Sequence, residues 1–149
     1  MLNHVYHIIA TLGFTGYIPY APGTFGTAIG LLAILLIRPG DAVLLLLSIP
    51  VIIAGTVSAH HSEKALGKDS GHIVIDEFCG FLVSVMFLPK STGYLIAAFV
   101  LFRLFDIFKP PPINRIESSI SGGAGVMLDD LLAGVYANIC LQVWRGLFG

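Results

Sequence analysis

Long apolar runs, separated by glycine and proline turns, make up most of the chain. The runs cover residues 25–37, 42–59, 78–88, 94–102 and 131–144. None of them keeps the two-residue alternation of a half-buried strand, and their leucine, alanine and isoleucine content favours helices. The pattern therefore predicts a short N-terminal interfacial helix over residues 3–12 and about five main helices. The main helices are expected over residues 24–38, 42–64, 75–88, 91–108 and 128–147.

The composition favours a membrane environment for these helices. Of 149 residues, 56% are hydrophobic and 11% are charged, whereas an average soluble domain has about 25% charged residues. Disorder is excluded because it requires low hydrophobicity and high charge. A soluble helical bundle with a self-associating surface is the alternative, but it would expose large apolar patches. We expect an all-α fold, a polytopic membrane helical bundle that forms one domain over residues 1–149.

Other features of the sequence further restrict the class of protein to which the chain can belong. A net charge of −1 without a basic run disfavours nucleic-acid binding. The first 37 residues lack charged side chains, so the basic start of a secretory signal peptide is missing. Cys79 and Cys140 both lie in apolar runs, where cysteine behaves as a small hydrophobe. The five histidines show no metal-binding spacing.

Charged residues gather where the predicted helices end. Threading the helices back and forth across a membrane brings most acidic residues to one face: Glu63, Asp69, Asp76, Glu77, Asp106, Asp129 and Asp130. That face also carries five basic residues, against three on the other, namely Arg38, Lys90 and Arg145. Because cytoplasmic loops are enriched in lysine and arginine, we expect the acidic face to be cytoplasmic.

Two adjacent carboxylate pairs, Asp76-Glu77 and Asp129-Asp130, stand at helix starts. A single acidic residue there often interacts only with the helix dipole or caps the helix. Two pairs brought to one face instead favour a hard divalent cation. Mg²⁺ suits the pattern, since it binds one or two carboxylates together with water and substrate phosphate.

Three further groups are candidates for binding phosphate or for structure. Arg103, Asp106 and Lys109 share one helix face, and ionisable groups in an apolar helix are functional candidates; a purely structural Arg103–Asp106 pair is the alternative. Thr24 either caps its helix or binds phosphate at the helix N-terminus. The glycine-rich residues 121–125 form either a flexible connector or a phosphate-binding loop.

Four segments together resemble phosphatidylglycerophosphatase A, a bacterial phospholipid phosphatase family. They are APGTFG at 21–26, VIDEFCG at 74–80, FRLFDIFKPPPI at 102–113 and GGAGVMLDDLLAG at 122–134. The resemblance implies Mg²⁺-dependent hydrolysis of phosphatidylglycerophosphate to phosphatidylglycerol and phosphate. It also implies a multi-pass protein of the bacterial cytoplasmic (inner) membrane. The triple proline is richer than the family's usual Lys-Pro-x-Pro.

The expected active site combines carboxylates and cations. We expect catalytic roles for Asp76, Glu77, Asp106, Asp129 and Asp130, and all of these except Asp106 are expected to bind Mg²⁺. Thr24, Arg103 and Lys109 are expected to bind the substrate phosphate, because positive groups stabilise charge on phosphoryl oxygens. The expected partners are the lipid substrate, membrane lipids and, as an open question, a second copy of the chain.

Alternative functions make different demands on the sequence. A histidine-based lipid phosphatase needs a late histidine, but none follows His72. A cysteine phosphatase needs Cys-x₅-Arg, and Arg145 follows Cys140 one residue too soon. The non-enzyme alternative is a membrane protein that binds or transports a divalent cation without catalysis. It predicts acidic residues along a path through the membrane rather than at one face.

Overall fold

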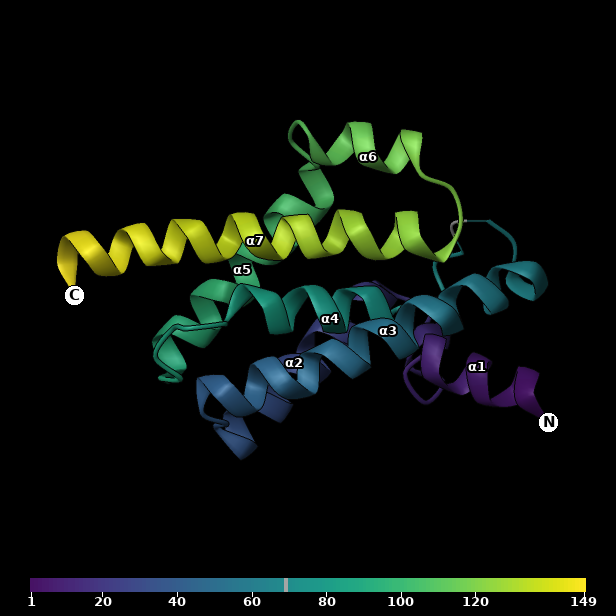
Figure 1. Cartoon of the computed structure of the whole chain (residues 1–149), viewed down its shortest axis with the longest axis horizontal. Helices are drawn as coiled ribbons and strands as arrows, with labels where there is room; N and C mark the ends of the chain where they lie inside the picture. The colour runs from purple at the N-terminus through teal and green to yellow at the C-terminus, as the bar shows by residue number, and fades with distance from the viewer. Residues whose placement is uncertain (69) are drawn as a thin grey trace.

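The chain is all-helical in its computed structural model, which describes residues 1–68 and 70–149 (Figure 1). Asp69 therefore lies outside the described residues. The helices are α1 (Leu2–Ala10), α2 (Pro22–Ile37), α3 (Asp41–Leu66), α4 (Ile75–Ser84), α5 (Thr92–Phe108), α6 (Ile113–Ser119) and α7 (Gly123–Phe148). The all-α prediction is confirmed: α1 is the predicted short N-terminal helix, and α2, α3, α4, α5 and α7 correspond to the five predicted main helices.

Three details differ from the prediction. Helix α4 ends at Ser84 rather than at residue 88, because the amide of Asn138 on α7 takes up carbonyls at its end. Asn138 Nδ2 donates to the carbonyls of Ser84 at 3.1 Å and Met86 at 2.8 Å. Helix α6 was not predicted; it is short, follows three prolines and is anchored by the buried Ile113.

Helix α7 begins at Gly123, so the glycine-rich segment is largely the first turn of a helix rather than a flexible connector. Phosphate binding by its backbone N–H groups stays a prediction. Gly123 lies against α3, where an added Cβ would stand 2.4 Å from the backbone nitrogen of His60. An added Cβ at Gly125 would stand 2.1 Å from the carbonyl oxygen of Ile120. Glycine at these positions therefore permits close packing. An interpretation of the segment as a flexible connector does not predict these contacts.

Helix α4 is the centre of the bundle, beside α7 and between α2 and α3 (Figure 1). Its ten residues span about 15 Å, too short to cross a hydrocarbon core of about 30 Å. The core around it contains large, fully buried side chains, including Phe81, Leu95 and Phe102. The buried centre thus fixes the position of the first turn of α4, which carries Asp76 and Glu77.

The outside of the bundle is strongly apolar. Helices α3 and α7 are long and apolar enough to span a membrane. Only 28% of the most apolar 18-residue window of α3 is buried, whereas the core helix of a soluble protein would be mostly buried. Large hydrophobic side chains are exposed along several helices, among them Leu36, Leu46, Ile53, Val100 and Leu147. Patches of this kind mark surfaces that contact lipid or another protein.

The two ends of the bundle differ in chemistry. At one end, Lys90 Nζ lies 2.8 Å from Asp41 Oδ1, and Arg145 donates to the carbonyl of Phe87 at 3.0 Å. This end therefore holds the α2–α3 turn, the α4–α5 turn and the end of α7. The starts of α4 and α7 and the end of α5 lie at the opposite end, as the threading of the helices predicted.

Candidate active site

A polar cavity of about 170 Å³ lies at the end of the bundle where α4 and α7 begin and α5 ends. All five predicted catalytic carboxylates line it, together with the amine-bearing side chain of Lys109. Residues 70–73 and the segment around Ile120 and Gly125 complete its wall. The helix ends thus gather five acidic groups from three separate parts of the sequence into one site.

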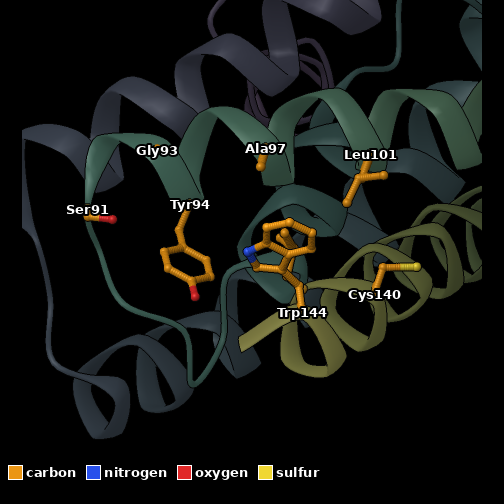
Figure 2. A pocket seen from close by; sticks show the side chains of 8 residues that line it. Ser91, Gly93, Tyr94, Ala97, Leu101, Cys140 and Trp144 are labelled. Atoms are coloured by element: carbon orange, nitrogen blue, oxygen red, sulfur yellow. The ribbon is translucent and has the colours of Figure 1, made fainter. Parts of the chain in front are cut away.

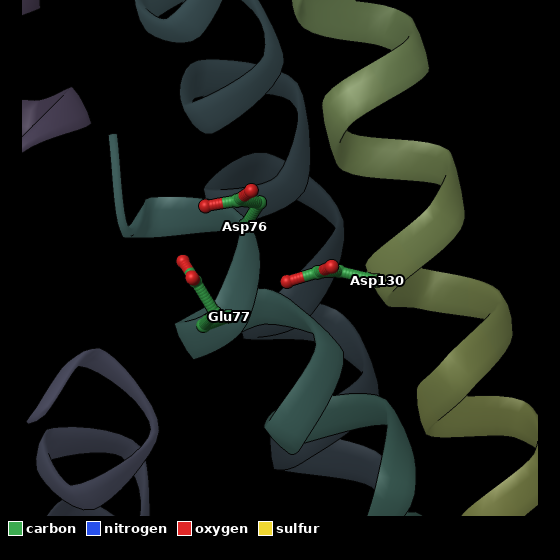
Figure 3. A group of neighbouring side chains, drawn as sticks. All are labelled: Asp76, Glu77 and Asp130. Carbon is green, nitrogen blue, oxygen red and sulfur yellow. The ribbon is translucent and has the colours of Figure 1, made fainter. Parts of the chain in front are cut away.

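Three of these carboxylates, Asp76, Glu77 and Asp130, form a compact group that we call the carboxylate trio (Figure 3). One oxygen from each lies within 4.8 Å of the others. Asp76 and Glu77 extend from the first turn of α4, and Asp130 reaches toward them from α7 (Figure 3). Asp76 is 6% exposed and Asp130 is 3% exposed, so water solvates neither carboxylate well.

Each member of the trio has a buried oxygen without a hydrogen-bond partner among the described residues: Asp76 Oδ1, Glu77 Oε2 and Asp130 Oδ2. Buried polar atoms are normally paired, so each such exception requires an explanation. Like-charged carboxylates in a low dielectric also repel one another strongly. Together these features favour a positive ion between the three groups.

Burial also shifts the pKa values of the two carboxyl groups in the first turn of α4, a helix too short to span a membrane. Burial, and then the charge of Glu77, raise the pKa of Asp76 well above its ordinary value. Burial likewise raises the pKa of Glu77. Desolvation penalises the charged form of a carboxyl group, so these two residues need nearby positive charge to remain ionised.

The other two carboxylates are paired with basic side chains. Arg103 Nη1 donates to Asp106 Oδ2 within the last turns of α5. Lys109 Nζ, at the end of α5, donates to Asp129 Oδ2 on α7 at 2.5 Å. Asp129 Oδ1 also accepts a bond from the backbone N–H of Asp130 at 3.1 Å. The site thus has one part formed by the three carboxylates of the trio and another part in which acidic and basic side chains are paired.

The first turn of α2 packs against this site through Gly23. A Cβ at Gly23 would stand 2.2 Å from Glu77 Oε1 and 3.3 Å from Arg103 Nη1. The absence of a side chain at Gly23 permits this close approach, which brings the positive end of the α2 dipole close to the carboxylate of Glu77. Thr24 is the next residue on α2. Among the described residues that line the cavity, neither Thr24 nor Arg103 is found.

Two glycines missed by the sequence analysis set the spacing of the trio. Helices α4 and α7 touch at Gly80 and Gly134: a Cβ at Gly134 would stand 2.3 Å from the carbonyl oxygen of Gly80, and one at Gly80 would stand 2.7 Å from that of Asp130. Each glycine follows a trio aspartate by four residues, one helical turn. The repeated Asp-x₃-Gly spacing of Asp76–Gly80 and Asp130–Gly134 was the signal available in the sequence.

Comparisons with known proteins show the family of the chain. The chain matches the family model of phosphatidylglycerophosphatase A over residues 8–145. It is 36% identical to phosphatidylglycerophosphatase A of Haemophilus influenzae, over 97% of this chain and 92% of that protein. The identity to phosphatidylglycerophosphatase A of Escherichia coli is 35%, over 90% of this chain and 80% of that protein.

A Bacteroides thetaiotaomicron protein, provisionally named as a phosphatidylinositol-3-phosphatase, is also 36% identical, over 95% of both chains. No solved structure is significantly similar to the chain. The family match covers nearly the whole sequence and includes every residue of the carboxylate cavity. The chain belongs to the phosphatidylglycerophosphatase A family.

Proposed function

We propose that this protein is a Mg²⁺-dependent phospholipid phosphatase that hydrolyses phosphatidylglycerophosphate to phosphatidylglycerol and phosphate. The observation that carries the proposal is the carboxylate trio, with its unpaired buried oxygens, facing a cavity that also contains Lys109. Family membership supports the lipid phosphate as the substrate. A cation-transport function is less well supported, since these carboxylates gather at one end of the bundle.

Asp76, Glu77 and Asp130 fit a magnesium ion. Mg²⁺ prefers carboxylate oxygens as ligands. The trio would hold the ion through one oxygen from each side chain, since these oxygens lie within 4.8 Å of one another and each side chain also has a buried oxygen without a hydrogen-bond partner among the described residues. When bound, the ion would polarise the phosphoryl group and neutralise charge that develops on its oxygens.

Asp129 has a different environment from the trio. Its carboxylate holds Lys109 Nζ and the N–H of Asp130, so it positions the lysine next to the trio. Its role as a magnesium ligand stays a prediction. We assign Lys109 to the substrate phosphate, whose negative oxygens it neutralises as a point charge.

Arg103 and Asp106 act as a pair in the proposed reaction. Hydrolysis forms a bond between a water oxygen and phosphorus and breaks the bond from phosphorus to the glycerol oxygen. A proton leaves the water, and the departing glycerol oxygen gains one. Asp106 lines the cavity outside the trio and is held by Arg103, so we assign it to this proton transfer. Thr24 and the first turn of α2 stay candidates for binding the phosphate.

We place the protein in the bacterial cytoplasmic membrane as a multi-pass protein, with the cavity at the cytoplasmic headgroup level. The exposed apolar side chains and the two long apolar helices support this placement. The basic residues at the cavity end outnumber those at the other end by five to three, which agrees with a cytoplasmic location. A site at a helix end also keeps the carboxylates out of the hydrocarbon, where charge is costly.

The proposed function is tested by measuring phosphate release from purified protein in detergent micelles. We expect turnover of phosphatidylglycerophosphate with Mg²⁺ and its loss when a chelator removes the ion. Phosphatidic acid and phosphatidylinositol-3-phosphate serve as competing substrates, the second because one relative carries that name. Preference for either competitor would contradict the assigned substrate, and full activity in chelator would contradict the magnesium requirement.

A further inference from the structure

A second, apolar groove of about 590 Å³ lies between α5 and α7, away from the carboxylates (Figure 2). Gly93, Tyr94, Ala97 and Leu101 face it from α5, and Cys140 and Trp144 face it from α7 (Figure 2). Its volume falls in the range of about 300–1,000 Å³ that is typical of small-molecule sites. None of its lining residues has a role in the proposed reaction.

The groove is concave because small residues lie opposite large ones. Gly93 and Ala97 follow each other by one turn on α5, and a Cβ at Gly93 would meet nothing within 4 Å. The indole of Trp144 extends from α7 toward α5, and the side chain of Leu101 points from α5 toward α7 (Figure 2). An extended apolar chain fits such a channel better than a compact or charged ligand does.

The groove lies along the same antiparallel contact between α5 and α7 as Lys109 and Asp129 of the catalytic cavity. On α5, Leu101 and Ser91 precede Asp106 by five and fifteen residues, which correspond to about 7.5 and 22 Å. On α7, Cys140 follows Asp129 by eleven residues, close to three full turns, so both side chains lie on the same face. The groove therefore lies farther along the bundle than the phosphate site and extends toward the opposite end, where Ser91 lies.

An aromatic pair stands between the groove and the cavity in the order of residues along α5 and α7. Phe105 on α5 and Tyr136 on α7 pack edge to face, with ring centroids 5.6 Å apart, and the Tyr136 hydroxyl donates to the carbonyl of Pro111 at 3.0 Å. The order along the two helices is Lys109–Asp129, then Phe105–Tyr136, then the groove. The surface thus changes from charged to apolar in the same order as a phospholipid does.

We propose that the groove binds an acyl chain of the lipid whose phosphate lies in the cavity; this inference rests on the proposed function. One leaflet of the hydrocarbon core is roughly 15 Å deep. A chain that begins several ångströms below the phosphate therefore reaches the half of the groove nearer the cavity, which Leu101 and Ala97 line. Apolar burial in the groove would raise kcat/KM for long-chain lipid above that for lipid with short chains.

The test compares two substrates that share the same headgroup, dipalmitoyl and dihexanoyl phosphatidylglycerophosphate, in one detergent. Ala97→Trp fills the groove from α5, and Cys140→Trp fills it from α7. Ala54→Trp is the matched control, because Ala54 is exposed on α3. We expect both groove variants to lower kcat/KM for the long-chain lipid about tenfold or more, with dihexanoyl lipid changed less than about twofold.

The short-chain substrate reports whether each variant still folds and catalyses. Equal loss for both substrates, or unchanged long-chain turnover, would overturn the proposal, the latter because ordinary membrane lipid then fills the groove. A change in oligomeric state that accompanies equal losses would assign the groove to a second copy of the chain and would also overturn it. Wild-type protein that hydrolyses neither lipid would instead show that the proposed function itself is wrong.

Discussion

Buried carboxylates that face one another destabilise a folded protein unless positive charge joins them. The buried carboxylates of Asp76, Glu77 and Asp130 face one another in this way, and each has one buried oxygen that no described residue pairs. The sequence identified both acidic pairs as candidates. It did not separate Asp130 from Asp129, because neighbours on a helix point about 100° apart and only the packing shows which partner each one meets: the trio for Asp130, Lys109 for Asp129.

Substitution of Arg103 tests the basic half of the site. Arg103→Lys keeps the charge but loses the planar fork of the guanidinium, which holds Asp106 and lies near Gly23. We expect kcat/KM for phosphatidylglycerophosphate to fall about a hundredfold, the usual cost of one preorganised donor. Arg38→Lys, at the far end of the bundle, is the control. Unchanged kinetics for Arg103→Lys would show that Arg103 is only structural.

At the scale of elements, the contact between α4 and α7 determines the geometry of the site. Apolar runs rich in leucine, alanine and isoleucine, bounded by glycine and proline turns, predicted both helices, because such runs report which local segments avoid water. It missed the end of α4 and the start of α7. The first depends on Asn138, more than 50 residues away from the carbonyls that it binds, and the second on glycines pressed against α3 and Ile120. Such distant contacts leave no local pattern in the sequence.

The glycine contact predicts a specific effect on metal binding. Gly134→Ala would press a methyl group into the backbone of Gly80, which forces α4 and α7 apart and separates Asp76 from Asp130. We expect the Mg²⁺ concentration for half-maximal activity to rise about tenfold or more, as for other changes that disturb ligand orientation. The Mg²⁺-induced rise in unfolding temperature should shrink in parallel.

Gly146→Ala is the matched control on the same helix, because a Cβ there meets nothing within 4 Å. It should bind Mg²⁺ like the wild type. If Gly134→Ala binds Mg²⁺ as tightly as Gly146→Ala does, the close helix contact does not set the spacing of the carboxylates.

At the scale of the whole molecule, the bundle has two polar ends and an apolar exterior between them. The carboxylate cavity occupies one end, and the Lys90–Asp41 ion pair marks the other. This division was predictable, since charges at the ends of alternating apolar segments must fall on two faces. The α5–α7 groove was not, because it depends on which small side chains of two distant helices face each other.

The central claim is that the carboxylate trio binds the magnesium ion on which phosphatase activity depends. The most direct measurement is phosphate release from phosphatidylglycerophosphate as Mg²⁺ is titrated, with Asp130→Asn and Asp41→Asn compared. Both variants remove one negative charge, at opposite ends of the bundle. We predict that Asp130→Asn loses about a hundredfold or more in turnover and no longer responds to Mg²⁺, while Asp41→Asn behaves like the wild type. Wild-type turnover and Mg²⁺ dependence in Asp130→Asn would contradict the account.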